Sequence, residues 1–380
     1  MSKLFNAKAQ RGKDAKARFC VFAPLRLCVL FFLFVVLVSC NPSSVAPASP
    51  TAGRNTPPSQ TTVNLKLSAG YTATVVAEGL QGPTQMILGP DQRLWVAQLV
   101  GNEEAGQGQV VALDLQTGQR QVLLDKLLKP VGLAVLKNYV WIAAKNALLR
   151  APLDANGKIG KIETVLANLP FNGRSIGTLT VTPDQQLLYE TSGARAGNRA
   201  VPGSATLWVL DPANPKNPRQ LATGLKGAYA QTYDQAGRLW TTEIADDPVN
   251  GVAPPDELNW VVAGADFGWP QCYGKREVAH DLGGTDAFCQ KTRAAVAIFP
   301  PHATPTSIVA SPWEKDTLFV ALWAQGIVMR VPVTIQGDNA TGTPEPFITG
   351  FQNVQHLLVL PDGALLVSDF SAGKIYRIIH

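Results

Sequence analysis

Residues 83–98 read PTQMILGPDQRLWVAQ: a short alternating strand, a Gly-Pro-Asp turn and a second strand of apolar and aromatic residues. Five more copies of this pattern follow: PVGLAVLKNYVWIAA (130–144), IGTLTVTPDQQLLYET (176–191), AYAQTYDQAGRLWTTE (228–243), TPTSIVASPWEKDTLFVAL (304–322) and VQHLLVLPDGALLVSD (354–369). Four of the five intervals between second strands are close to 48 residues, roughly the length of four short strands with their turns. The repeats therefore predict an all-β, six-bladed β-propeller with four-stranded antiparallel blades. Six copies in one register disfavour a regularly spaced β-sandwich, the alternative.

The spacing also predicts where the ring is interrupted and where it closes. The interval between Leu239 and Leu318 exceeds the others by about 30 residues, so blade four should carry an insertion at about 246–300. The strand-like run YTATVVA (71–77) precedes the first copy and should complete the last blade, which removes two open sheet edges.

Composition supports a globular β-rich chain. Hydrophobic residues make up 46% of the chain, which excludes a largely disordered protein. Charged residues make up only 16%, and the chain holds 33 Gly and 28 Pro; this composition disfavours helical bundles. The net charge of +5 comes from residues 1–40, which hold seven of the 33 Lys and Arg, so the remainder carries −1. Charge-driven nucleic-acid binding is therefore not expected.

The N-terminal segment is typical of a bacterial lipoprotein signal. Residues 27–39, LCVLFFLFVVLVS, are apolar but too short to span a bilayer comfortably, which takes about 20 residues. The sequence Leu37-Val38-Ser39-Cys40 resembles a lipobox, in which Cys40 is lipidated. We expect a signal peptide (1–40), a Pro/Ser/Thr-rich linker (41–64) and the propeller (65–380), exported and lipid-anchored to the outer face of a bacterial membrane. An uncleaved signal anchor is the alternative.

Two cysteines remain beyond the leader, Cys272 and Cys289. In an exported protein this pair predicts a disulfide within the insertion of blade four, with two free thiols as the alternative.

Polar residues at the starts of the inner strands should converge on the mouth of the central channel. They are Thr84, Gln85, Arg174, Ser175, Lys226, His302, Thr304, Asn353 and Gln355, with apolar Val131 at the corresponding place in blade two. Arg174, Lys226 and His302 would give this mouth a positive rim, although each alone could be an ordinary surface residue.

Several motifs resemble the glucose/sorbosone dehydrogenase family, and most closely its sorbosone dehydrogenase-like branch. They are PPDELNWVVAGADFGWPQCYG (254–274), PHATP (301–305), LFVALW (318–323) and PDGALLVSDFSAGKIYRI (361–378). The resemblance runs from about residue 70 to 380. It implies a six-bladed propeller that oxidises a sugar hydroxyl by hydride transfer to pyrroloquinoline quinone (PQQ).

The same resemblance assigns candidate site residues. It implies a Ca²⁺ at Glu257 and Phe267, where a backbone carbonyl can serve a cation that prefers oxygen; the alternative is that Asp256 and Glu257 only cap a turn.

The family's catalytic His falls on Arg174, which cannot act as a base, so His302 is the candidate replacement. Cofactor contacts are expected at Arg174, Lys226, Gly227, Asn353 and Gln355, although Lys226-Gly227 and Asn353 depart from the Arg-Asn pair and the Arg of the family.

Two functions therefore stay open. The first is a PQQ-dependent sugar dehydrogenase with an altered catalytic site. It would pass electrons to a separate acceptor, because no Cys-x-x-Cys-His haem motif is present. The second is a catalytically degenerate propeller that binds a sugar, an anionic ligand or a protein partner. A metal-dependent lactonase or esterase ranks last, because it needs more axial carboxylate or His ligands than the sequence offers.

Overall fold

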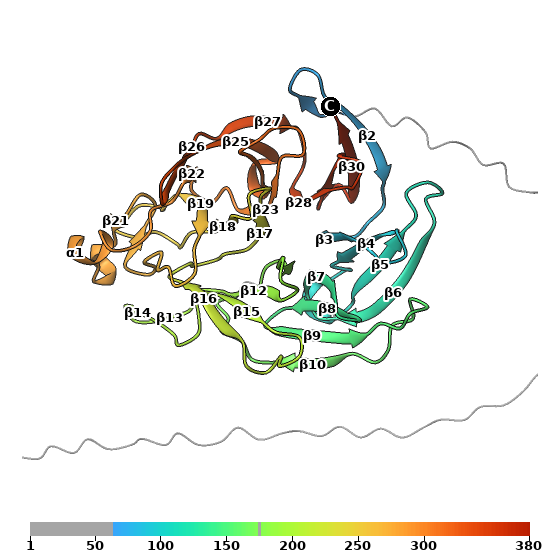
Figure 1. Cartoon of the computed structure of the whole chain (residues 1–380), viewed down its shortest axis with the longest axis horizontal. Coiled ribbons are helices and arrows are strands. Elements are labelled where there is room, and N and C mark those ends of the chain that lie inside the picture. The colour runs from blue at the N-terminus through green and yellow to red at the C-terminus, as the bar shows by residue number, and fades with distance from the viewer. Residues whose placement is uncertain (1–63, 174–175) are drawn as a thin grey trace, which may run out of the picture. The chain divides into compact units, whose positions relative to one another are not determined.

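The computed structural model describes residues 64–173 and 176–380, which form six antiparallel sheets around a central channel (Figure 1). Blade one holds β3 (Pro83–Leu88), β4 (Leu94–Gln98), β5 (Gly108–Leu113) and β6 (Arg120–Leu127). Blade two holds β7 (Pro130–Leu136), β8 (Tyr139–Ala144), β9 (Ala147–Pro152) and β10 (Glu163–Leu166). Blade three holds β11 (Thr180–Val181), β12 (Leu187–Thr191), β15 (Thr206–Leu210) and β16 (Arg219–Thr223).

Blade four holds β17 (Gln231–Tyr233), β18 (Leu239–Glu243), β19 (Asp256–Val261) and β22 (Ala297–Phe299). Blade five holds β23 (Pro305–Ala310), β24 (Thr317–Leu322), β25 (Ile327–Gln336) and β27 (Glu345–Thr349), and β26 (Asn339–Gly342) pairs with the end of β25. Blade six holds β28 (Val354–Val359), β29 (Leu365–Asp369), β30 (Lys374–Ile379) and β2 (Thr72–Ala77). The six-bladed prediction is confirmed, and each of the six sequence copies forms the inner two strands of one blade.

The ring closes as predicted from the sequence. Strand β2 runs antiparallel to β30, with Thr72 opposite Ile379, so the N-terminal strand forms the outer edge of the last blade. The sequence did not predict β1 (Lys66–Leu67), which adds to β27 at the edge of blade five. The start of the described chain therefore covers the edges of two neighbouring blades.

The second strand of each blade is buried on both faces, because it packs between the neighbouring blades. Strands β4, β8, β12, β18, β24 and β29 are buried along almost their whole length, which explains their continuous apolar sequences. Trp95 and Trp240 lie in two of these strands, and their indole N–H groups donate to Asp91 and Asp234 at 2.9 and 2.8 Å. In blades one and four, the Asp-turn-Trp pattern therefore corresponds to a partly buried hydrogen bond from the buried indole to the turn.

Polar side chains join the inner strands to one another. Thr84, Thr180 and Thr306 each donate a hydroxyl hydrogen bond of 2.8 to 3.0 Å to a backbone carbonyl in the inner strand of the next blade. The ring closes through His356 of β28, whose Nδ1 accepts from the Met86 amide at 3.4 Å. Burial lowers the pKa of His356 to about 3, so this imidazole is neutral and serves as an acceptor.

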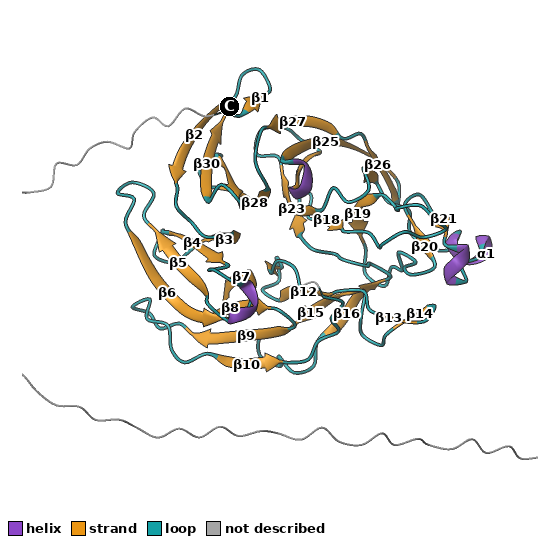
Figure 2. Ribbon diagram, turned by 180° about the vertical axis from the view of Figure 1, so that it is seen from behind, coloured by secondary structure: helices purple, strands orange, loops and turns teal. Residues whose placement is uncertain are grey.

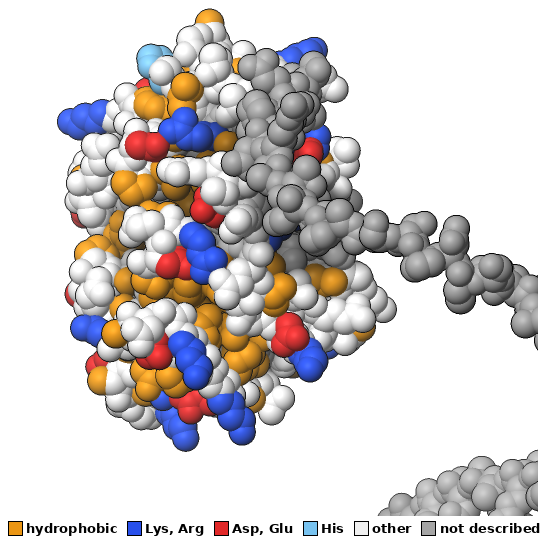
Figure 3. Space-filling model, turned by 90° about the vertical axis from the view of Figure 1, so that its right-hand side faces the viewer, with side chains coloured by type: hydrophobic (Ala, Val, Ile, Leu, Met, Phe, Trp, Pro, Cys, Tyr) orange, Lys and Arg blue, Asp and Glu red, His pale blue; other side chains and the backbone are white. Residues whose placement is uncertain are grey.

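Two hairpins and the helix α1 lie outside the blades on one side of the ring (Figure 2). They are β13 (Arg195–Ala196) with β14 (Arg199–Ala200), β20 (Cys272–Tyr273) with β21 (Glu277–Val278), and α1 (Asp286–Cys289). Short 3-10 helices cover Glu103–Ala105, His280–Leu282 and Trp323–Gln325. No helix among the described residues is long and apolar enough to cross a membrane. On the face shown in Figure 3, basic and acidic side chains lie interspersed.

Candidate functional site at the channel mouth

Buried side chains fix the loops that lead into the channel. In four blades, a polar side chain in the last two residues of the second strand accepts a hydrogen bond from a backbone N–H of the loop before the inner strand. These acceptor and donor pairs are Gln98 with Gln81 (3.1 Å), Glu190 with Gly177 (3.0 Å), Glu243 with Lys226 (2.6 Å) and Asp369 with Asn353 (3.1 Å). Because each N–H is satisfied by a buried group, the loops at this end of the ring are held in one conformation.

Blades one, two, four, five and six, together with Gly173 in the loop that leads into blade three, line a pocket of about 380 Å³ at the channel mouth. Its lining residues are Thr84, Leu99, Glu103, Lys129, Val131, Gly173, Tyr229, Ile244, Thr304, Thr306, Trp323, Gln355 and Phe370. Four of the ten residues predicted to converge are therefore brought together: Thr84, Val131, Thr304 and Gln355.

One wall of this channel-mouth pocket is aromatic. The Trp323 and Phe370 rings meet edge to face, with their centroids 6.1 Å apart. Deeper in the pocket, the Gln355 side-chain amide donates to the Tyr229 hydroxyl at 3.1 Å. Burial raises the pKa of Tyr229, so its hydroxyl stays protonated and neutral.

The ammonium group at the pocket wall is paired with carboxylates. Lys129 Nζ lies 3.2 Å from Glu103 and 2.7 Å from Glu104, and Lys145 binds the other oxygen of Glu104 at 3.0 Å. Desolvation lowers the pKa of Lys129, but its hydrogen bonds to Glu104 and Glu103 outweigh this effect and raise the pKa above its usual value. Lys129 therefore stays charged, and its charge is compensated.

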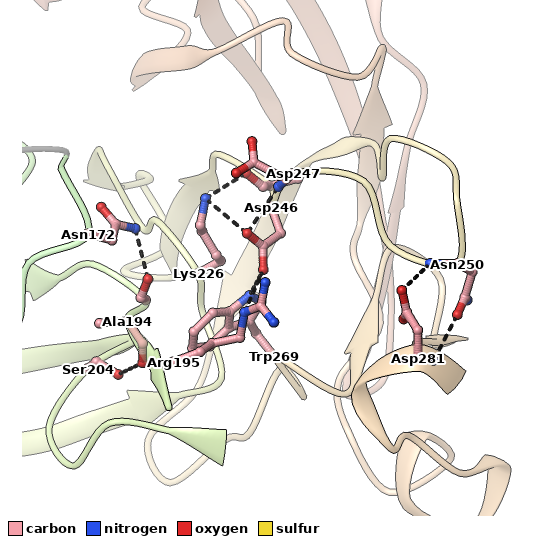
Figure 4. Close-up of polar contacts among 12 residues, drawn as sticks. Asn172, Ala194, Arg195, Ser204, Lys226, Asp246, Asp247, Asn250, Trp269 and Asp281 are labelled. Carbon is pink, nitrogen blue, oxygen red and sulfur yellow. Dashed lines mark hydrogen bonds and ion pairs between the residues drawn. The ribbon is translucent and has the colours of Figure 1, made fainter. Parts of the chain in front are cut away.

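A second pocket, which we call the side pocket, has a volume of about 570 Å³ and lies between blades three and four (Figure 4). It is lined by Phe171, Asn172, Gly193, Ala194, Arg195, Gly197, Lys226, Asp246, Asp247 and Trp269. It lies beside the channel-mouth pocket, since Asn172 is followed in the chain by Gly173, which lines the latter.

Asp246 is the centre of the side pocket. Its carboxylate accepts from the Trp269 indole at 3.0 Å and lies 3.4 Å from Arg195 Nε and 3.7 Å from Lys226 Nζ (Figure 4). Lys226 also donates to the Ala245 carbonyl at 3.0 Å. The sequence predicted that Lys226 lies on a positive rim at the channel mouth; the structure places it in the side pocket instead, where Asp246 offsets its charge.

The other residues predicted to contact a ligand are not among the described residues that line either pocket. Arg174 and Ser175 lie outside the described residues. His302 is exposed on the loop before β23, and the described residues that line the two pockets do not include it. Asn353 donates to the Trp323 carbonyl at 3.1 Å, beside the pocket. Gly227 packs behind Ile244, where a Cβ atom would meet the Ile244 carbonyl at 3.2 Å.

The predicted calcium ligands are buried and already bonded. Glu257 accepts hydrogen bonds from the Gly274 amide and from Asn259 Nδ2, and it lies opposite Glu243 on the neighbouring strand. Desolvation raises the pKa of Glu257 to about 7 and raises that of Glu243 well above its usual value. In the described structure, this carboxyl pair therefore favours the protonated state, and the Glu257 oxygens are occupied by N–H donors.

No cluster of three or more His, Cys, Asp or Glu side chains suited to a metal occurs among the described residues. Phe267 is likewise buried, and its N–H donates to the Thr223 carbonyl at 2.9 Å. Asp256 takes a capping role, since it accepts from the Ala245 and Thr304 amides at 2.7 Å each. Calcium binding at Glu257 and Phe267 stays a prediction from the resemblance.

The predicted disulfide between Cys272 and Cys289 is present, and both residues are buried. It joins β20 to α1 within the segment between β19 and β22. This segment also supplies Trp269 to the wall of the side pocket.

The sequence analysis did not identify four apolar and aromatic residues that line the channel-mouth pocket. Leu99, Ile244, Trp323 and Phe370 each follow directly after the second strand of a blade, and all four line the channel-mouth pocket. Aligning the six repeats at this position would have found them, because aromatic residues occupy it in blades five and six.

Comparisons with known proteins agree with the fold and with the resemblance. Residues 213–377 match the family model described as Glucose / Sorbosone dehydrogenase, which confirms the predicted resemblance; the sorbosone branch stays a prediction. No curated protein sequence matches the chain.

Three solved structures illustrate the shared fold. The holo form of the pyranose dehydrogenase PQQ domain from Coprinopsis cinerea is 19% identical, covering 84% of this chain and 98% of that chain with a TM-score of 0.68. The PQQ-bound aldose sugar dehydrogenase from Streptomyces coelicolor is 20% identical, covering 82% and 99% with a TM-score of 0.63. A calcium structure of a Trichoderma reesei carbohydrate-active enzyme of family AA12 is 16% identical, covering 84% and 98% with a TM-score of 0.68.

Proposed function

Because residues 213–377 match the glucose/sorbosone dehydrogenase family model, we propose that this protein is an exported sugar dehydrogenase-like propeller. It binds a neutral sugar at the channel mouth and oxidises a sugar hydroxyl with PQQ as hydride acceptor. The single observation that carries the proposal is the channel-mouth pocket, which residues of five blades and of the loop before blade three line together.

The lining of this pocket suits a sugar ring. A pyranose has apolar C–H faces and a rim of hydroxyl groups, and Trp323 and Phe370 offer a surface for such a face. Thr84 of blade one, Thr304 and Thr306 at blade five, and Gln355 of blade six also line the pocket, and their hydroxyl and amide groups can exchange hydrogen bonds with sugar hydroxyl groups. The charged groups of the pocket, Glu103 and Lys129, offset one another, which favours a neutral ligand.

The same pocket offers PQQ two kinds of contact. PQQ is a flat aromatic tricycle with three carboxylates, so Trp323 and Phe370 would pack against its rings and Lys129 would meet a carboxylate. Lys129 would keep its ion pair with Glu104 at 2.7 Å while its remaining ammonium hydrogens meet the PQQ carboxylate. When bound, PQQ supplies a quinone that takes up the hydride from the sugar carbon.

Oxidation also needs an acceptor for the hydroxyl proton. Arg174, at the family's catalytic position, cannot fill this role. His302 stays the acceptor predicted from the sequence, two residues before Thr304 of the pocket wall. Glu103 is a second candidate, because its carboxylate lines the pocket directly.

A second candidate function is a propeller that binds a sugar without turning it over. The specific observation in its favour is the Lys226–Asp246 pair, because it leaves a predicted cofactor contact charge-compensated. The same pair disfavours a dedicated site for anionic ligands.

The deciding experiment combines calorimetry with a dye-reduction assay. PQQ is titrated with and without Ca²⁺, and a panel of neutral sugars is then assayed for PQQ-dependent dye reduction. We expect Trp323→Ala to lower kcat/KM by about tenfold, the equivalent of about 1.4 kcal/mol for a lost aromatic contact. Val122→Ala, at an exposed position on the outer strand β6, is the control and should leave activity unchanged. Sugar binding without dye reduction would favour the second function, and binding of neither sugar nor PQQ would contradict both.

A further inference from the structure

A third pocket lies on the outer side of Trp269, and the proposed function does not use it. This outer groove, of about 410 Å³, lies between the segment from the β13–β14 hairpin to β15 and the disulfide-linked insertion of blade four. Trp269 lines both the outer groove and the side pocket. Figures 1 and 2 show the hairpin and the insertion on the same side of the ring.

The walls of the outer groove are fixed by specific contacts. Gly224 has a left-handed φ of 71°, and a Cβ atom there would lie 2.3 Å from the Asp266 carboxylate, so only glycine lets Asp266 approach this closely. Asp266 Oδ1 accepts from the Gly268 amide at 2.9 Å. On the opposite wall, Phe288 precedes Cys289, whose disulfide to Cys272 fixes α1.

The outer groove offers no open strand edge to a peptide. At the end of β16, the Thr223 amide donates to the Ala265 carbonyl and the Thr223 carbonyl accepts from the Phe267 amide, each at 2.9 Å. Across the groove, the Ser204 amide donates to the Val201 carbonyl at 2.9 Å. Because these backbone groups are already paired, strand addition is disfavoured and recognition must come from side chains.

The available side chains suit a neutral, hydroxyl-rich ligand. Arg199 and Gln220 are exposed at the rim, and Arg199 and Asp266 contribute one charge of each sign. The partly exposed Phe288 supplies an apolar surface beside these polar groups. Planar amide, guanidinium and carboxylate groups beside an apolar surface form the combination that binds sugar rings.

We propose that the outer groove is a second carbohydrate subsite, and that the protein therefore takes a neutral oligosaccharide chain. One sugar unit lies against Phe288, and the chain passes Trp269, which lines both pockets, towards the side pocket. The proposal rests on the proposed function only for the chemical class of the ligand, since length-dependent binding does not require turnover.

The test is calorimetric titration of the full chain with neutral maltose-series and cellulose-series sugars, from the monosaccharide to the hexasaccharide. We expect affinity to rise at least about tenfold along one series. Phe288→Ala and Gln220→Ala should each lower affinity for the hexasaccharide about fivefold and leave monosaccharide affinity unchanged. Gln235→Ala, at an exposed glutamine outside the three pockets described above, is the matched control. Circular dichroism and non-reducing mass spectrometry confirm that each variant is folded and keeps its disulfide.

The outcomes separate this inference from the proposed function. Affinity independent of chain length in both series, or equal effects of Gln220→Ala and Gln235→Ala, would overturn the inference while sugar oxidation could still stand. Length-dependent affinity that is lost in Phe288→Ala would support the inference even if no sugar is oxidised.

Discussion

Replacing Glu190 should change how stability depends on pH. This carboxyl is buried beneath the loop that enters blade three, and Oε1 accepts from the Gly177 amide at 3.0 Å and from Ser192 at 3.3 Å. Within the described chain, Oε2 has no hydrogen-bond partner. Desolvation raises the pKa of Glu190 from 4.5 to about 7, because burial penalises the charged form more than these hydrogen bonds favour it.

The size of the effect follows from this change in pKa. In the unfolded chain Glu190 ionises above about pH 4.5, whereas in the folded protein it stays protonated up to about pH 7. The folded state therefore holds a proton that the unfolded state has released, and stability falls as pH rises from about 4.5 to 7. The total loss is about 3 kcal/mol and is complete above the folded pKa.

Glu190→Gln removes the ionisation and keeps a side-chain oxygen to accept from Gly177. Between pH 4.5 and pH 8, the parent should lose about 3 kcal/mol of unfolding free energy relative to the variant, because only the parent must bury an ionisable carboxyl. Urea unfolding followed by tryptophan fluorescence at closely spaced pH values measures this difference. Glu78→Gln is the control, because its carboxylate is 62% exposed. A difference curve for Glu190→Gln as flat as that for Glu78→Gln would refute the burial argument.

Three further predictions concern the anchor, the insertion and the side pocket. Cys40→Ala should release the protein from the membrane fraction or block its processing, and unchanged fractionation would show that no lipid is attached there. The double variant Cys272→Ser/Cys289→Ser should lose about 3 kcal/mol of unfolding free energy by the loop-entropy estimate for a separation of 17 residues, and chemical denaturation with intact parent as reference checks this. Asp246→Asn should remove one negative charge 3.7 Å from Lys226 and raise calorimetric affinity for the anionic PQQ about fivefold, and equal or weaker binding would contradict the compensation argument.

The sequence predicted the architecture because the repeated feature is the one that burial constrains most. The second strand of every blade is buried on both faces, so it must be continuously apolar, and its recurrence near every 48 residues is visible without a structure. The closing strand β2 was predictable for a different reason: its alternating run directly precedes the first copy of the repeat, and the last blade needed an outer strand. Strand β1 was not, since two residues in Lys66–Leu67 are too few to show alternation.

The site was less predictable, because it depends on which side chains face one another across loops. Lys226 and Asp246 lie on opposite sides of strands β17 and β18 in the sequence, and only the folded blade brings them to 3.7 Å. His302 and Thr304 lie in the same loop, but only Thr304 lines the pocket. The sequence could not show which of these two neighbouring side chains faces the channel mouth.

The channel-mouth pocket has different walls because one position of the repeat carries different residues. Directly after the second strand, blades five and six have Trp323 and Phe370, whereas blades two and three have Lys145 and Ser192. Lys145 binds Glu104, which also holds Lys129 at the pocket wall. A sugar in this pocket would therefore place its C–H face towards Trp323 and Phe370 of blades five and six, and its hydroxyl groups towards Lys129 and Glu103, on the side of blades one and two.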